Sequence, residues 1–227
     1  MNHEASRVAL VIGASGLTGA KLVRALLDTP AYTRVLALSR RPLPLSHDRL
    51  ANRVLRFEDM EAQLQGSHCH DAFCCLGTTI RAAGSQPAFR AVDQDLVLRF
   101  ARLALQLGAR QIVVVSSVSA NAQSKNFYLR VKGETERALA DMKPEGLHLM
   151  QPSLMLGARR ESRWQETLAK GAALLAGPFL IGDASRWRAI RAEAVAAAMV
   201  TAALTGRRGV HRYEFAQILR MARRNAS

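Results

Sequence analysis

The chain of 227 residues has only three cysteines, Cys69, Cys74 and Cys75, and its first residues show no secretory signal. An odd number of cysteines without an export signal argues against a disulfide framework and predicts a reducing compartment, which we take to be the cytoplasm. The apolar stretches 168–181 and 189–204 are interrupted by charges and fall short of the roughly 20 apolar residues that a membrane span needs. We therefore expect no membrane-spanning segment.

Acidic and aromatic residues are also scarce. Asp and Glu number 18 against 32 Lys and Arg, which leaves a formal net charge of +14. Such a charge attracts anions, but it does not distinguish a phosphate-bearing cofactor from an acidic partner or nucleic acid. The densest basic segment is 207–224. Because few aromatic residues and no recognised binding motif accompany it, we expect a solvated helix surface there rather than a nucleic-acid site.

Apolar strands alternate with helical patterns along the first two thirds of the chain. We predict helices over 17–27, 87–107 and 127–142, and strands over 7–12, 35–38, 53–57, 72–76, 111–115 and 147–151. This order is typical of an α/β protein with a Rossmann-type, doubly wound parallel sheet. Residues 1–227 are then one NAD(P)-binding domain, with a core at 1–152 and a small lid or substrate region at 153–227.

The predicted lid region has a looser pattern than the core. We expect helices over 164–176 and 192–204, a short segment at 210–213 and a last helix. Trp164 and Trp187 lie in this region. Packing is the expected role of both, and lining of a substrate pocket is the alternative.

A glycine-rich turn follows the first predicted strand. Its residues are Gly13, Ala14, Ser15, Gly16, Leu17, Thr18 and Gly19. The first glycine allows a tight turn, the second lets the backbone approach a pyrophosphate, and the third lets the helix pack closely on the strand. Backbone amides at the start of the helix would bind the phosphates. Because the turn lies between a strand and a helix, we predict a dinucleotide site here.

The end of the second strand lacks the acidic residue that commonly binds the ribose of NAD. Ser39, Arg40 and Arg41 stand there instead, about 20 residues after the last glycine of the turn. Guanidinium groups suit a ribose 2′-phosphate through charge-assisted hydrogen bonds. We therefore predict NADP(H) as the cofactor, with NAD(H) as the second candidate.

Tyr128 and Lys132 lie four residues apart in a predicted helix and so share one face. A free phenol has a pKa near 10, and a neighbouring ammonium favours the phenolate, so such a tyrosine could exchange a proton with a substrate oxygen. Ser116 and Ser117 directly follow the predicted strand at 111–115, where a hydroxyl could bind the substrate carbonyl. Spacing alone is weak support for this chemistry, because pairs of this kind are common.

The order of these motifs resembles the short-chain dehydrogenase/reductase superfamily, and within it the atypical group. The resemblance covers 7–152 and includes the glycine turn, the segment 74–79, the paired serines and the segment 128–132. It implies a catalytic set of Ser117, Tyr128 and Lys132, with Ser116 as the alternative serine. It also implies that Leu76, Gly77, Thr78, Ser116, Lys132 and Pro152 contact the cofactor.

The sequence thus favours an NADP(H)-dependent oxidoreductase that acts on a small carbonyl or alcohol. The alternative is a non-catalytic protein that senses NADP(H) and binds a protein partner. A monomer or a homodimer is expected. The segment 67–71, with Cys74 and Cys75 after it, contains residue types that bind zinc, but the two cysteines should point to opposite faces of a strand, so we predict no metal site.

Overall fold

A parallel sheet of seven strands forms the centre of the computed structural model, which describes residues 6–156 and 186–224. The strand order is β3-β2-β1-β4-β5-β6-β9, and every neighbouring pair is parallel. The strands are β1 (Arg7–Ile12), β2 (Tyr32–Ser39), β3 (Leu50–Val54), β4 (Asp71–Cys74), β5 (Gln111–Val115), β6 (Gly146–Met150) and β9 (Gly209–Tyr213). A separate parallel pair joins β7 (Met155–Leu156) to β8 (Ile190–Arg191).

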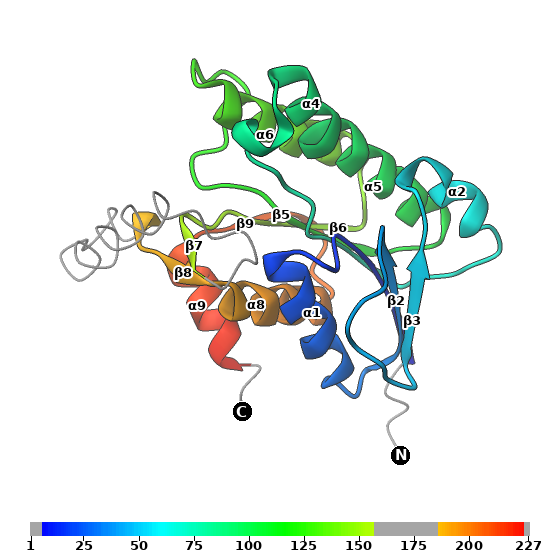
Figure 1. Cartoon of the computed structure of the whole chain (residues 1–227). Helices are drawn as coiled ribbons and strands as arrows, with labels where there is room; N and C mark the ends of the chain where they lie inside the picture. Colours follow the sequence, from blue (N-terminus) through cyan, green and yellow to red (C-terminus); the bar gives the residue numbers. More distant parts are fainter. Residues whose placement is uncertain (1–5, 157–185, 225–227) are drawn as a thin grey trace.

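Helices cover both faces of the sheet (Figure 1). One face carries α1 (Leu17–Leu27), α8 (Ala192–Leu204) and α9 (Phe215–Arg224). The other carries α2 (Met60–Gln63), α4 (Gln86–Arg90), α5 (Leu96–Gln106) and α6 (Phe127–Asp141), with the short helices η1 (Phe57–Asp59) and α3 (Ile80–Ala83) at its margin. Alternate strand residues point to opposite faces, so Val11 packs under α1 and α8 whereas Ile12 packs under the second layer. The Rossmann-type fold predicted from the sequence is confirmed.

Strand β2 begins at Tyr32, three residues before its predicted start at residue 35, and two further elements differ from the prediction. The outer strand β3 begins at Leu50, three residues before the predicted start at residue 53. It is only partly buried, and Asn52 interrupts its apolar pattern; this side chain donates to the carbonyl of Ala37 at 3.0 Å instead of packing. The long helix predicted over 87–107 is divided into α4 and α5 by a π-helical turn, η2 (Ala91–Asp95).

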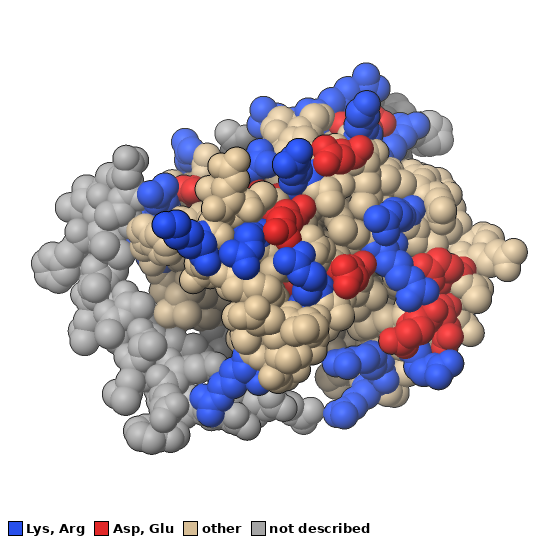
Figure 2. Space-filling view, turned by 90° about the horizontal axis from the view of Figure 1, so that it is seen from above, with Lys and Arg blue, Asp and Glu red and all other residues tan. Residues whose placement is uncertain are grey.

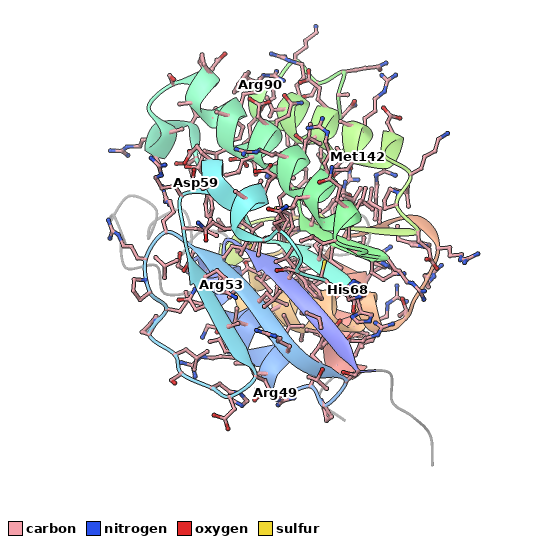
Figure 3. All side chains as sticks on the ribbon, turned by 90° about the vertical axis from the view of Figure 1, so that its right-hand side faces the viewer. Arg49, Arg53, Asp59, His68, Arg90 and Met142 are labelled. Atoms are coloured by element: carbon pink, nitrogen blue, oxygen red, sulfur yellow. The ribbon has the colours of Figure 1, made fainter. Side chains whose placement is uncertain are left out.

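The connection before β3 is fixed to the end of α1. Arg49, labelled at the foot of the sheet in Figure 3, donates to the carbonyl of Tyr32 at 2.9 Å and to that of Leu27. A guanidinium at this place satisfies carbonyl groups that the helix end leaves free. The start of β3 is thereby held beside the end of α1 and the start of β2, at the amino edge of the sheet.

Part of the region predicted as a lid belongs to the sheet and its core. Residues 209–213 add the seventh strand beside β6, and α8 packs between α1 and α9 with most of its side chains buried. The helix predicted over 164–176 and Trp164 lie outside the described residues. Trp187 is 49% exposed and stacks with Arg186. Within the described residues, every helix is too short or too polar to cross a bilayer.

A buried polar cluster joins the last three strands of the sheet. His148 on β6 contacts the Tyr213 hydroxyl of β9 at 3.0 Å and the Gln111 side-chain oxygen of β5 at 2.8 Å. Burial, with smaller contributions from His211 and Arg207, lowers the pKa of His148 to about 4 from the usual 6.5. The folded protein therefore keeps His148 neutral where the unfolded chain would protonate it.

This cluster predicts a loss of stability in weak acid. Above about pH 6.5 His148 is neutral in both the folded and the unfolded state. Between pH 6.5 and 4 only the unfolded chain binds the proton. His148 should therefore lower the free energy of unfolding by about 3 kcal/mol across this range. Urea unfolding across this range would measure the loss. The slope should flatten in His148→Gln and persist in the exposed control His47→Gln; an unchanged slope in His148→Gln would contradict the assignment.

Candidate functional site

The glycine turn has the close backbone approaches that its spacing predicts. Gly13 has a φ of +77°, and a Cβ on it would lie 2.7 Å from the carbonyl carbon and oxygen of Cys75. A Cβ on Gly19 would lie 2.1 Å from the carbonyl oxygen of Gly13. Among the described residues no side chain caps the start of α1 at Gly16, so the first amides of the helix stay free there for an anion. The turn therefore fits a diphosphate.

The residues around this turn follow neighbouring strands at the carboxyl edge of the sheet. Gly13 directly follows β1, Arg40 follows β2 and Ser116 follows β5. Leu76 lies two residues after the end of β4 at Cys74. Strand order reverses between β1 and β4, and this is where ligands bind in open α/β sheets. The fold thus brings the predicted cofactor residues from separate parts of the sequence to one edge.

A pocket of about 710 Å³ lies beyond the ends of β2 and β3. Its lining combines apolar side chains such as Phe57 with basic ones, Arg40 among them, and with the acidic Glu58 and Asp95. Arg40 is exposed and lies over the Phe57 ring, and no carboxylate in the described part of the chain pairs with it. Arg41 does not line the pocket.

Ser39 differs from its predicted role in what its hydroxyl contacts. Its side chain is buried, donates to the carbonyl of Arg41 at 2.7 Å and accepts from the Asn52 amide at 2.8 Å. The hydroxyl thus shapes the turn that presents Arg40. Thr18 is likewise buried, with its hydroxyl 3.4 Å from the Met155 sulfur, whereas Ser15 is exposed at the turn.

Lys132 is buried on α6 and its ammonium is paired. Its Nζ lies 2.7 Å from Oδ1 of Asp93, and Asp93 is itself fully buried. Burial alone would lower the pKa of Lys132, but the charges of Asp93 and Tyr128 outweigh it and raise the pKa above its usual value. Tyr128, one turn earlier, is half-buried against the Phe89 ring, 5.6 Å away between centroids. The lysine is therefore a fixed positive charge beside the phenol.

The two serines after β5 have different partners. Ser116 is buried and donates to a carboxylate oxygen of Glu136 at 2.5 Å. Ser117 is half-buried, and its only hydroxyl contact within the described residues is a 3.3 Å bond to the carbonyl of Val118. Ser117 is thus the serine with a hydroxyl free to turn toward a substrate.

Asp93 and Glu136 are the polar residues of this site that the sequence interpretation missed. Glu136 accepts hydrogen bonds from Ser116, from Gln151 at 2.8 Å and from Arg212 at 3.1 Å. Both carboxylates had a detectable signal. Asp93 lies four residues from Phe89 on the buried stripe of its helix, and Glu136 lies four residues after Lys132.

The remaining predicted residues line the same edge. The Thr78 amide donates to Asp93 at 2.8 Å, and a Cβ on Gly77 would be 3.7 Å from that carboxylate. Leu76 is buried, as is Pro152, whose carbonyl accepts from the Val118 amide at 3.0 Å.

The histidines and cysteines near β4 do not gather around a common point. His68 and His70 stack edge to face, and Cys69 is buried under α5. In the described ranges, no three His, Cys, Asp or Glu residues lie where they could hold a metal ion.

The basic residues are spread over the surface. On the face formed by α4, α5 and α6, blue and red side chains lie interspersed (Figure 2), and Arg90 pairs there with Glu134 at 2.6 Å. Near the end of the chain, Arg212 pairs with Glu136 and Arg208 with Glu145. The nucleic-acid alternative stays untested by these contacts.

Comparison with known proteins identifies relatives along most of the chain. The chain is 37% identical over 164 residues to Protein HTATIP2 of Rattus norvegicus. This alignment covers 70% of this chain and 67% of that protein. The chain is 30% identical over 216 residues to the mitochondrial Protein FMP52 of Coccidioides immitis, with 88% and 86% covered. A scan against protein-family models finds no match.

Solved structures share the fold at low identity. MoeE5, determined with UDP-glucose and NAD, superposes with a TM-score of 0.68 at 17% identity and covers 95% of this chain and 81% of that one. The ADP-L-glycero-D-manno-heptose-6-epimerase of Helicobacter pylori gives a TM-score of 0.69 at 14% identity, with 95% and 79% covered. These structures support the Rossmann-type architecture.

The names of the relatives also correct one expectation. Several FMP52 proteins are named mitochondrial, which contradicts the cytoplasmic location expected from the sequence. A low cysteine count indicates a reducing compartment but does not distinguish one such compartment from another. From its identity to HTATIP2 and FMP52 over two thirds or more of their lengths, the chain belongs to the HTATIP2 and FMP52 family of atypical short-chain dehydrogenase/reductases.

Proposed function

We propose that the chain binds NADP(H) along the carboxyl edge of its sheet and transfers hydride between this cofactor and a small carbonyl or alcohol. The observation that carries the proposal is the turn at Gly13 to Gly19, where any Cβ at the first or last glycine would collide with backbone. Such a cradle is needed where a diphosphate lies against main-chain amides. The free amides at the start of α1 supply the donors.

The other cofactor contacts follow from the same edge. Leu76, Gly77 and Thr78 would border the ribose, and the pocket behind Arg40 has the size and apolar lining to take an adenine. Arg40 would bind a 2′-phosphate, because its guanidinium is exposed at this pocket and has no carboxylate partner among the described residues. Ser116, Lys132 and Pro152 would border the nicotinamide half.

The proposed chemistry assigns one task to each catalytic side chain. When bound, the nicotinamide supplies or accepts the hydride. Tyr128 would exchange a proton with the substrate oxygen, and the Lys132 ammonium one helical turn away would supply a fixed positive charge to the site. Ser117 would donate its hydroxyl hydrogen bond to the same substrate oxygen.

Calorimetric titration with NADPH and NADH tests the cofactor assignment. The wild type should bind NADPH more tightly than NADH. Arg40→Gln should bind NADPH about 10- to 100-fold more weakly, because this is what the loss of one hydrogen bond to a charged group usually costs in affinity. Its affinity for NADH should change little. Arg41→Gln is the matched control and should stay close to the wild type. Equal loss for both cofactors in Arg40→Gln would contradict the 2′-phosphate contact.

An activity assay on the same purified protein distinguishes an oxidoreductase from a non-catalytic protein that senses NADP(H). Turnover of NADPH with any member of a carbonyl panel supports the oxidoreductase. Tight NADPH binding without hydride transfer across the panel would instead favour a non-catalytic protein whose partner binding responds to the cofactor.

A further inference from the structure

The π-helical turn η2 (Ala91–Asp95) places a charged side chain inside the helical layer. It interrupts what is otherwise one helix from α4 to α5. π-helical turns are rare and are found frequently at functional sites, because the extra residue shifts the side chains that follow. Here the turn carries Asp93, which has no exposed surface.

Asp93 contacts two other elements at once. Its Oδ2 accepts from the Thr78 amide at 2.8 Å, in the loop after β4, and its Oδ1 lies 2.7 Å from Nζ of Lys132 on α6. The second contact is an ion pair, since Oδ1 makes no well-aligned hydrogen bond within the described residues. The carbonyl of Asp93 also accepts from the Thr135 hydroxyl at 3.2 Å. The turn is thus joined to α6 by main chain and side chain.

Stability alone does not account for this pair. Taking two charges out of water costs about as much as their attraction returns, and apolar residues of similar size commonly serve a core as well or better. A buried ion pair next to a cofactor loop and a candidate acid/base tyrosine is therefore better explained by what it does for the site.

We propose that Asp93 is a positioning residue: the π-helical turn presents its carboxylate so that it fixes the charged ammonium of Lys132 and the Thr78 amide in one arrangement. The importance of this arrangement for catalysis rests on the proposed function, whereas the arrangement itself does not. Asp93 thereby couples the loop that would border the cofactor to the helix that carries Tyr128 and Lys132.

The surroundings of Lys132 leave the pairing to Asp93. Tyr128 and Glu136 face it from its own helix and Cys74 from β4. Glu136 is already engaged with Ser116, Gln151 and Arg212. The cavity lined by Lys132, Asp93 and Glu136 measures about 10 Å³, which leaves room for one water molecule at most, so no solvent ion can replace the carboxylate.

A pH titration of the lysine side chains by ¹⁵N NMR tests the inference, and the chain suits it because it contains five lysines. In the wild type, the Lys132 ammonium should persist above pH 10.5, the ordinary lysine value. In Asp93→Asn, which keeps the oxygen for the Thr78 amide but removes the charge, Lys132 should lose its proton about one to three pH units lower. Asp141→Asn removes an exposed carboxylate from α6 and should titrate as the wild type does.

Two results would overturn the inference. One is a wild-type Lys132 that titrates at or below pH 10.5, which needs no variant and so decides the matter even if Asp93→Asn does not fold. The other is a folded Asp93→Asn whose Lys132 titrates as in the wild type. Calorimetry with NADPH on the same samples keeps the two proposals apart: a wild type that binds no NADPH contradicts the proposed function, while the lysine titration still decides the role of Asp93.

Discussion

Gly13→Ala should abolish measurable NADPH binding and destabilise the fold. An alanine here must hold a φ of +77°, which costs roughly 1–2 kcal/mol, and its Cβ would lie 2.7 Å from the Cys75 carbonyl group. The turn can relieve this collision only by moving β1 away from the loop after β4. The phosphate-binding amides would then move as well, and losing two or more charge-assisted hydrogen bonds lowers affinity by at least about 100-fold.

Gly66→Ala is the matched control for this substitution. Gly66 has a φ of +76°, but a Cβ there would meet nothing within 4 Å. Gly66→Ala should therefore lose stability through its backbone conformation alone, without a steric collision, and should bind NADPH as the wild type does. Urea unfolding and calorimetry on both variants measure the difference. If Gly13→Ala bound NADPH as well as Gly66→Ala does, the turn would not be the phosphate site.

Tyr128→Phe should lose about 10²- to 10⁴-fold in turnover while NADPH still binds. This is the usual contribution of a positioned acid or base, and the substitution removes only the hydroxyl, so packing against Phe89 is kept. The measurement is kcat with the best substrate of a carbonyl panel, alongside NADPH affinity. A variant that retains wild-type turnover would rule out Tyr128 as the acid/base residue.

The paired serines supply the comparison within the same assay. Ser117→Ala should lower kcat, because its hydroxyl is the one free to reach a substrate. Ser116→Ala removes a bond to Glu136 and should act mainly on stability. A larger loss of kcat in Ser116→Ala than in Ser117→Ala would reverse this assignment of roles.

Local features of the fold could be predicted from the sequence. The apolar runs of β1 and β5 are typical of strands in a parallel sheet, and the close approach of Gly19 to Gly13 arises within the seven residues of the glycine turn. Helix α8 also carried a signal, since a segment that is apolar on all sides belongs in a core rather than in a lid.

Long-range pairings could not be predicted in the same way. The segment of β9 is mostly exposed and only weakly apolar, so its place depends on pairing with β6, 63 residues earlier by the register of Gly146 with Gly209. The contact of Asp93 with Lys132 likewise depends on how α6 packs against the π-helical turn. The sequence located the lysine by its spacing from Tyr128, but its partner emerges only from the packing of the two helices.

A backbone amide NMR titration of the wild type with NADPH tests the proposed phosphate site at the glycine turn. The amides of residues 14–19, around the start of α1, should shift and saturate at one equivalent, because the free amides among them would bind the diphosphate. Saturable binding that leaves these amides unmoved, or no binding of either nicotinamide cofactor, would contradict the proposed site.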